Sequence, residues 1–155
     1  MSVFIDSDVK FAPKARPVPY NYRISYKVSQ LCLILNICST RGGCSFAKLH
    51  LLAAALLSES EFNRILDVCN HTADYVMPVI HFDPSVTAAL QFAIADGFIA
   101  QNTNKTIRLT DKGKSFCKKI MDDSDLMGHV NARLKHIGNR LTNEKVKLIS
   151  DATGV

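Results

Sequence analysis

The run from Lys27 to Thr40 limits most strongly what this chain can fold into. Its sequence, KVSQLCLILNICST, carries apolar side chains on nearly every side of a helix rather than along one stripe. Such a helix is stable in water only when other elements enclose it. Gly42 and Gly43 follow in an RGG segment, and glycine is the residue that most readily ends a helix. The sequence therefore predicts a central helix that the rest of the chain surrounds.

Two helices are predicted directly after this one. Ser45 can cap a helix that ends near residue 57, and its apolar residues follow helical spacing. Ser58 and Glu61 resemble a capping box for an amphipathic helix over residues 58–70. The following segment, 74–82, is prone to β-structure but contains a proline, so we expect an edge strand or an extended link there.

A further helix begins at Asp83 and Pro84, because an aspartate at the N-cap followed by proline is a strong helix start. Gly97 ends it. Its predicted buried stripe consists of Val86, Ala89, Leu90, Ala93 and Ile94.

A short β-hairpin follows. FIAQNT and KTIRLT alternate between apolar and polar residues on either side of Asn104, which is typical of two antiparallel strands with Asn in the turn. Thr110 then caps a helix with Phe116 and Ile120 directed inward. Further helices are expected from Ser124 and from Thr142.

The predicted fold is mainly α with a small β-hairpin, a winged-helix-like single domain with additional C-terminal helices. Residues 1–25 carry three prolines and are expected to be extended, with no helix before Tyr26. The winged-helix-like core spans residues 26–122, and a C-terminal helical extension spans residues 123–155.

The composition is typical of a globular protein, with 47% apolar and 21% charged residues. The sequence has no apolar run long enough for a membrane span and no secretory leader, which predicts a soluble, cytoplasmic protein. The odd number of cysteines indicates reduced thiols. A zinc site could be drawn from Cys38, Cys44, His50 and Cys69, but buried small apolar side chains fit their spacing better.

Positive charge is concentrated near the C-terminus. Residues 1–100 hold eight Lys/Arg and eight Asp/Glu, whereas residues 101–155 hold eleven and six. Six of these cations lie in and just after the predicted hairpin. They can form a solvated helix face or a patch that holds the phosphate backbone of double-stranded DNA without sequence preference. These candidate DNA-backbone contacts are Lys105, Arg108, Lys112, Lys114, Lys118 and Lys119.

The helix before the hairpin argues against reading of base edges. In a winged helix this element would enter the major groove, where Arg, Lys, Asn and Gln make most base contacts. Residues 84–96 contain one Gln, no Arg or Lys, and end in Asp96. About 25 residues, including the predicted helix over 58–70, also separate the helix that ends near Leu57 from this one, whereas a compact helix-turn-helix uses roughly three or four.

No catalytic motif is found. The RGGC stretch lacks the Lys-Ser/Thr of a phosphate-binding loop, and neither HExxH nor GxSxG occurs. His50 lies among leucines, which is typical of a core histidine. The sequence therefore predicts neither enzymatic activity nor a bound cofactor.

Several stretches together resemble a known family. They are RPVPYN, SQLCLILNIC with GGCSFAKLHLLAAAL, FDPSVTAALQFAIADGFI, RLTDKGKSF and LKHIGNRLTNEKVKLI. They look like the middle component of bacterial three-component ABC-type ATPase systems, which include Lamassu-type anti-phage defence. The resemblance implies a non-catalytic winged-helix subunit that docks a coiled-coil ATPase of the structural-maintenance-of-chromosomes (SMC) type. A third, effector subunit, often a nuclease, would complete the system.

Two other classes of function are consistent with parts of the sequence. A homodimeric winged-helix transcriptional regulator would use its terminal helices to dimerise. A small metal-dependent sensor would use the Cys and His residues named above. The missing cations on residues 84–96 disfavour the regulator.

Overall fold

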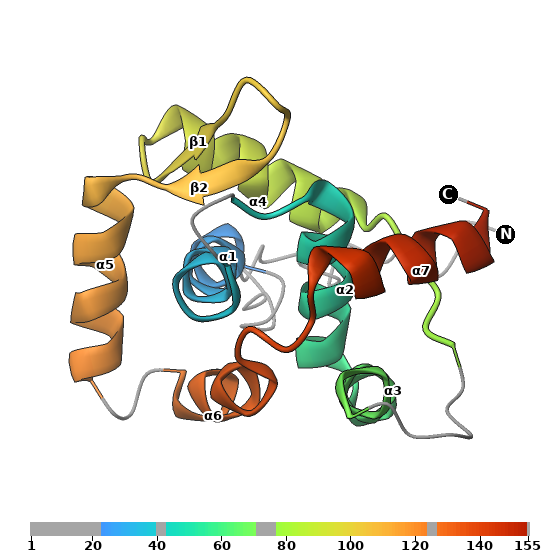
Figure 1. Ribbon diagram of the computed structural model, residues 1–155. Coiled ribbons are helices and arrows are strands. Elements are labelled where there is room, and N and C mark those ends of the chain that lie inside the picture. The colour runs from blue at the N-terminus through green and yellow to red at the C-terminus, as the bar shows by residue number, and fades with distance from the viewer. Residues whose placement is uncertain (1–22, 40–42, 71–76, 124–126, 155) are drawn as a thin grey trace, which may run out of the picture.

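In the computed structural model the chain forms seven helices and a two-stranded antiparallel sheet within its described residues, which are 23–39, 43–70, 77–123 and 127–154 (Figure 1). This confirms the mainly helical fold with a hairpin. In chain order the elements are α1 (Ile24–Cys38), α2 (Phe46–Leu57), α3 (Glu59–Cys69), α4 (Pro84–Ala95), β1 (Ile99–Gln101), β2 (Ile107–Leu109), α5 (Asp111–Asp122), α6 (Gly128–Ile137) and α7 (Asn143–Thr153).

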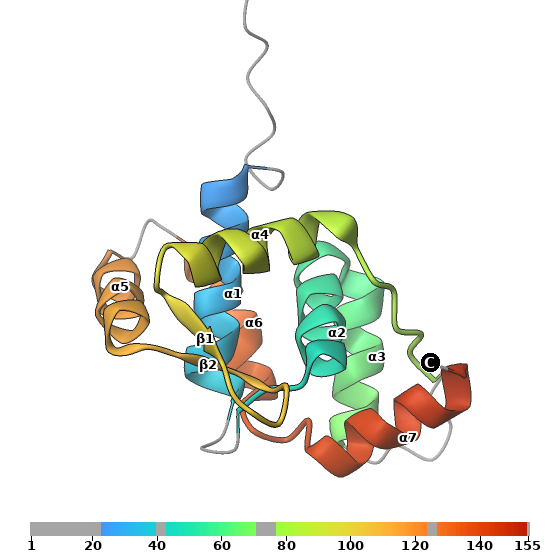
Figure 2. The same cartoon turned by 90° about the horizontal axis from the view of Figure 1, so that it is seen from above.

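α1 is the enclosed helix that the sequence predicted. It lies among α2, α4, α5, α6 and β2 (Figures 1 and 2). Its buried residues lie on several sides of the helix. The helix begins at Ile24, so the prediction of no helix before Tyr26 was wrong. Apolar periodicity marks only buried turns, and Ile24 and Ser25 are exposed.

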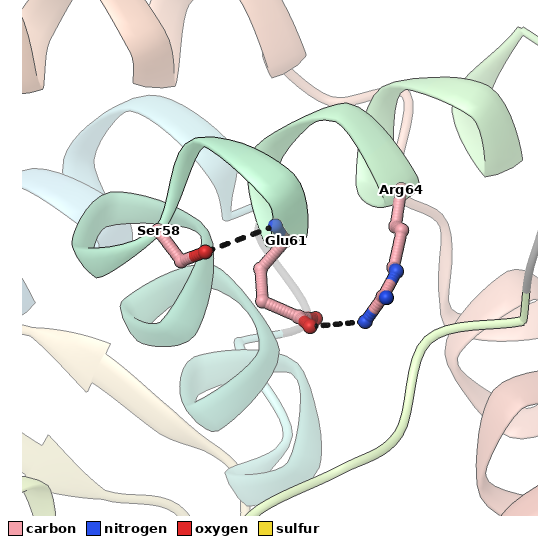
Figure 3. Close-up of polar contacts among 3 residues, drawn as sticks. All are labelled: Ser58, Glu61 and Arg64. Atoms are coloured by element: carbon pink, nitrogen blue, oxygen red, sulfur yellow. Dashed lines mark hydrogen bonds and ion pairs between the residues drawn. The ribbon is translucent and has the colours of Figure 1, made fainter.

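One residue, Ser58, joins α2 to α3. Its Oγ accepts a hydrogen bond from the Glu61 amide at 3.4 Å, as predicted for a cap (Figure 3). Its own N–H donates to the carbonyl of Ala54 and closes α2. The Glu61 carboxylate pairs with Arg64 instead, so only half of the predicted capping box forms.

α4 starts as predicted, with Asp83 accepting from the Ser85 amide at 2.8 Å and Pro84 in the first turn. Gly97 follows its end with φ +82°, a conformation that favours glycine. Ile94 was wrongly assigned to the buried stripe, since its side chain is 38% exposed. The residues of α4 that are buried are Val86, Ala89, Leu90 and Ala93.

The hairpin strands are three residues each, shorter than predicted, and Ala100 pairs with Arg108 at their centre. The left-handed residue of the turn is Lys105, with φ 67°. Asn104 acts through its side chain, whose Oδ1 accepts from Thr106. Cys44, between α1 and α2, forms an antiparallel bridge with Ile107 and so adds a third backbone segment beside β2.

The last two helices pack on the same core as the others. Val130, Leu134 and Ile137 of α6 are buried against α1 and α3, and α7 packs on α2 (Figure 1). Thr142 caps α7 as predicted, whereas the predicted start of α6 at Ser124 lies outside the described residues. None of the described helices is long and apolar enough to cross a membrane.

Candidate nucleic-acid interface

β2 and α5 position five of the six predicted basic residues, and the hairpin turn carries the sixth. Thr110 fixes the joint between the two elements, because its hydroxyl accepts from the Gly113 amide at 3.1 Å and also contacts the Phe98 carbonyl. Gly113 is required there, since a Cβ at this position would lie 2.2 Å from the Phe98 carbonyl oxygen. The six residues are all exposed: Lys105, Arg108, Lys112, Lys114, Lys118 and Lys119.

The structure does not gather these cations on one face. Lys112 and Lys119 are seven residues apart and share one side of α5. Lys114 and Lys118 are four apart and share another. Lys105 lies in the hairpin turn, separate from both.

Lys112 has a structural role. Its Nζ donates to the carbonyl of Asp96 at 2.7 Å, at the C-terminal end of α4, and lies 4.8 Å from the centre of the Phe98 ring. A cation at this end of a helix interacts favourably with the helix dipole and satisfies a carbonyl left without a helical partner. Lys112 is therefore a poor candidate for contact with DNA.

Arg108 and Lys114 line one hollow of about 370 Å³. Arg108 donates through Nε to Oδ1 of Asn102 at 3.0 Å, which orients its guanidinium. Asp111 brings one carboxylate to the same hollow. The remaining lining residues come from the end of α1 and from β2: Leu35, Asn36, Ser39 and Leu109.

The outer surface of α4 differs from that of α5. It exposes Phe92 by 50% and Ile94 by 38%, and the helix contains no Lys or Arg. Gln91 is the one long polar side chain on it. This surface is chemically suited to an apolar partner rather than to phosphate or base edges.

Many of the other cations bind helix C-termini. Lys48 Nζ donates to the Cys38 carbonyl at 2.7 Å, Arg133 to Ala55 at 3.2 Å, and Lys145 to Cys69 at 3.2 Å. These contacts join residues up to 78 positions apart, so local sequence patterns carry no signal for them. The sequence-based charge count therefore overstated the charge available to a ligand.

The five cysteines are free and buried, as predicted for small apolar side chains. Burial raises the pKa of Cys38 and of Cys44 to about 12 each, so both stay protonated at neutral pH. Nowhere in the described ranges do three or more His, Cys, Asp or Glu side chains come together as metal ligands would. The zinc alternative therefore has no support in the geometry.

His50 is the buried histidine that the sequence predicted. Its Nδ1 accepts from the Asp83 amide at 3.2 Å, whereas its buried Nε2 has no partner among the described residues. The rings of Phe46 and Phe82 pack on it, with centres 4.7 and 5.0 Å from that of the imidazole. A cavity of about 140 Å³ lies beside it, lined also by His81. Phe46 and Phe82 are 37% and 48% exposed, so the prediction from helical spacing that Phe46 faces the core was wrong.

Comparisons with known proteins identify no relative: no family model, no curated protein and no solved structure matches the chain. The resemblance to three-component ATPase systems therefore stays a prediction.

Proposed function

We propose that this protein is a non-catalytic accessory subunit of an SMC-like ATPase complex in anti-phage or anti-plasmid defence. In this role it docks the ATPase and contacts the backbone of DNA without reading its sequence. The observation that carries the proposal is the contrast between two neighbouring surfaces. α4 exposes Phe92 and has no cation, whereas β2 and α5 expose Arg108, Lys114 and Lys118.

The element order supports a winged-helix plan for this subunit. α1, the bridge at Cys44, α2, α4 and the β1–β2 hairpin follow one another in the order of that fold. α3 lies in the segment that separates α2 from α4 and is additional to a compact helix-turn-helix. It packs on α2 and α6 at the end of the domain away from the hairpin (Figures 1 and 2). It would therefore leave both α4 and the hairpin open to partners.

The identity of the partners rests on the family resemblance. It implies a coiled-coil ATPase that hydrolyses ATP and an effector subunit, often a nuclease. The apolar surface of α4 supports docking of a protein, because aromatic residues are enriched at protein–protein interfaces. The same surface is unsuited to DNA, because α4 has no cation that could contact a phosphate.

Two variants separate the two proposed contacts. In co-expression with a coiled-coil ATPase of the SMC type, Phe92→Asp should abolish the copurified complex and leave DNA affinity unchanged. K118E/K119E should weaken DNA binding and leave the copurified complex intact. Leu148→Asp is the matched control for the first variant, because Leu148 of α7 is similarly exposed, by 52%.

A homodimeric regulator would behave differently. It would protect one DNA sequence at nanomolar concentration in physiological salt and would form a stable dimer without any ATPase. Either that behaviour, or a complex that survives Phe92→Asp, would overturn the corresponding part of the proposal.

A further inference from the structure

The hollow beside Arg108 lies on a particular side of the hairpin. β1 contacts α4, whereas β2 contacts α1 and α5. The lining residues come from the last turn of α1, from β2 and from the first turn of α5. In Figure 2 these three elements meet on the side of the hairpin away from α4.

The charge of the hollow favours an anion. Arg108 and Lys114 contribute two positive charges and Asp111 one negative charge. The last turn of α1 would add negative partial charge, but Lys48 Nζ donates to its Cys38 carbonyl at 2.7 Å and offsets it. Asn102 holds the Arg108 guanidinium in place, which lowers the entropy that binding would cost.

We propose that this hollow is a phosphate site, with Arg108 and Lys114 as its ligands, that takes a phosphodiester of the DNA backbone. This inference rests on the proposed function and adds a location to it. DNA then lies along α1, β2 and α5, on the side opposite to the helix that enters the major groove in DNA-reading winged helices. α4 is left free for the protein partner.

A salt titration tests the two ligands. Each lost phosphate contact reduces the slope of log affinity against log salt by about 0.9 for duplex DNA, so R108E/K114E should reduce it by about 2. K135E/K147E is the matched control, because it changes the net charge equally at exposed positions on α6 and α7. The control should bind DNA nearly as the wild type does.

Cross-linking tests the location independently. The native cysteines are at most 5% exposed, so a thiol-reactive photo-cross-linker should label an introduced surface cysteine selectively. Asn36→Cys, at the hollow, should cross-link to a DNA duplex, and Gln91→Cys, on α4, should not. Both positions are exposed. Cross-linking only from Gln91→Cys would overturn the inference.

The outcomes also separate this inference from the proposed function. If wild-type protein binds DNA and R108E/K114E binds it equally well, the hollow is not the site but the subunit still contacts DNA. If wild-type protein binds no DNA, the proposed function itself falls. ATP added as a competitor distinguishes the source of the phosphate: displacement of DNA at sub-millimolar ATP would mark a nucleotide site, whereas displacement by salt alone supports the backbone.

Discussion

At the scale of single residues, function depends on which cations remain available. Lys48, Lys112, Arg133 and Lys145 donate to backbone carbonyls at helix ends, and each contact satisfies an acceptor that would otherwise lack a partner. Side-chain identity is visible in the sequence, but the nearest carbonyl depends on packing between distant segments. This is why the sequence contains no sign that Lys112, a candidate DNA contact, donates to the end of α4.

His50 gives a pH-dependent test of the core. Burial lowers the pKa of its imidazole, while Asp83 and a backbone contact with His81 oppose that shift. The folded protein thus binds this proton less readily than the unfolded chain, whose value is about 6.5. The stability that comes from neutral His50 is present above that pH and is lost as the pH falls below it. Urea unfolding between pH 7.5 and 5 should show this loss, and His50→Gln should reduce it. An unchanged pH profile in the variant would contradict the assignment.

Gly113 tests the joint between the hairpin and α5. A methyl group there would meet the Phe98 carbonyl oxygen, so Gly113→Ala should destabilise the protein by about 1–3 kcal/mol. Gly128→Ala, at the start of α6, is the control, because no atom lies within 4 Å of the added Cβ. Thermal unfolding of both variants measures the difference. Equal melting temperatures would mean that the joint is looser than described.

At the scale of elements, local chemistry was sufficient where a cap is made by adjacent residues. Ser45, Asp83 and Thr142 cap the helices that they were predicted to cap. The errors arose where one group has two possible partners. Ser58 donates its N–H to α2, which leaves the Glu61 carboxylate no capping role, and the sequence contains no signal for that choice.

The end of α4 provides a prediction at this scale. Lys112→Met keeps much of the side chain that packs over Phe98 but removes the donor to Asp96, so it should cost about 0.5–1.5 kcal/mol of stability. Its affinity for DNA should stay close to that of the wild type. Lys118→Met should weaken DNA binding and leave the stability close to that of the wild type. Chemical unfolding measures the stability of each variant, and fluorescence anisotropy with a labelled duplex measures its affinity for DNA. A Lys112→Met protein that is as stable as the wild type but binds DNA weakly would show that Lys112 contacts DNA.

At the scale of the whole molecule, one core joins all seven described helices, and two surfaces of different chemistry lie on either side of the hairpin. The sequence predicted both the apolar character of α4 and the basic character of the hairpin and α5. It could not predict how they are oriented to each other, because α1 and Cys44 set the position of β2 from more than sixty residues away.

The central claim is that the protein contacts only the phosphate backbone of DNA and does not read the base sequence. Its most direct test is the affinity of the purified protein for two duplexes of equal length and unrelated sequence, measured from low to physiological salt. The five candidate cations that remain once Lys112 is set aside predict equal affinities for the two duplexes and a slope no steeper than about −4.5 in log affinity against log salt. Tight binding of only one duplex that persists in physiological salt would contradict the account, as would no binding to either duplex at low salt.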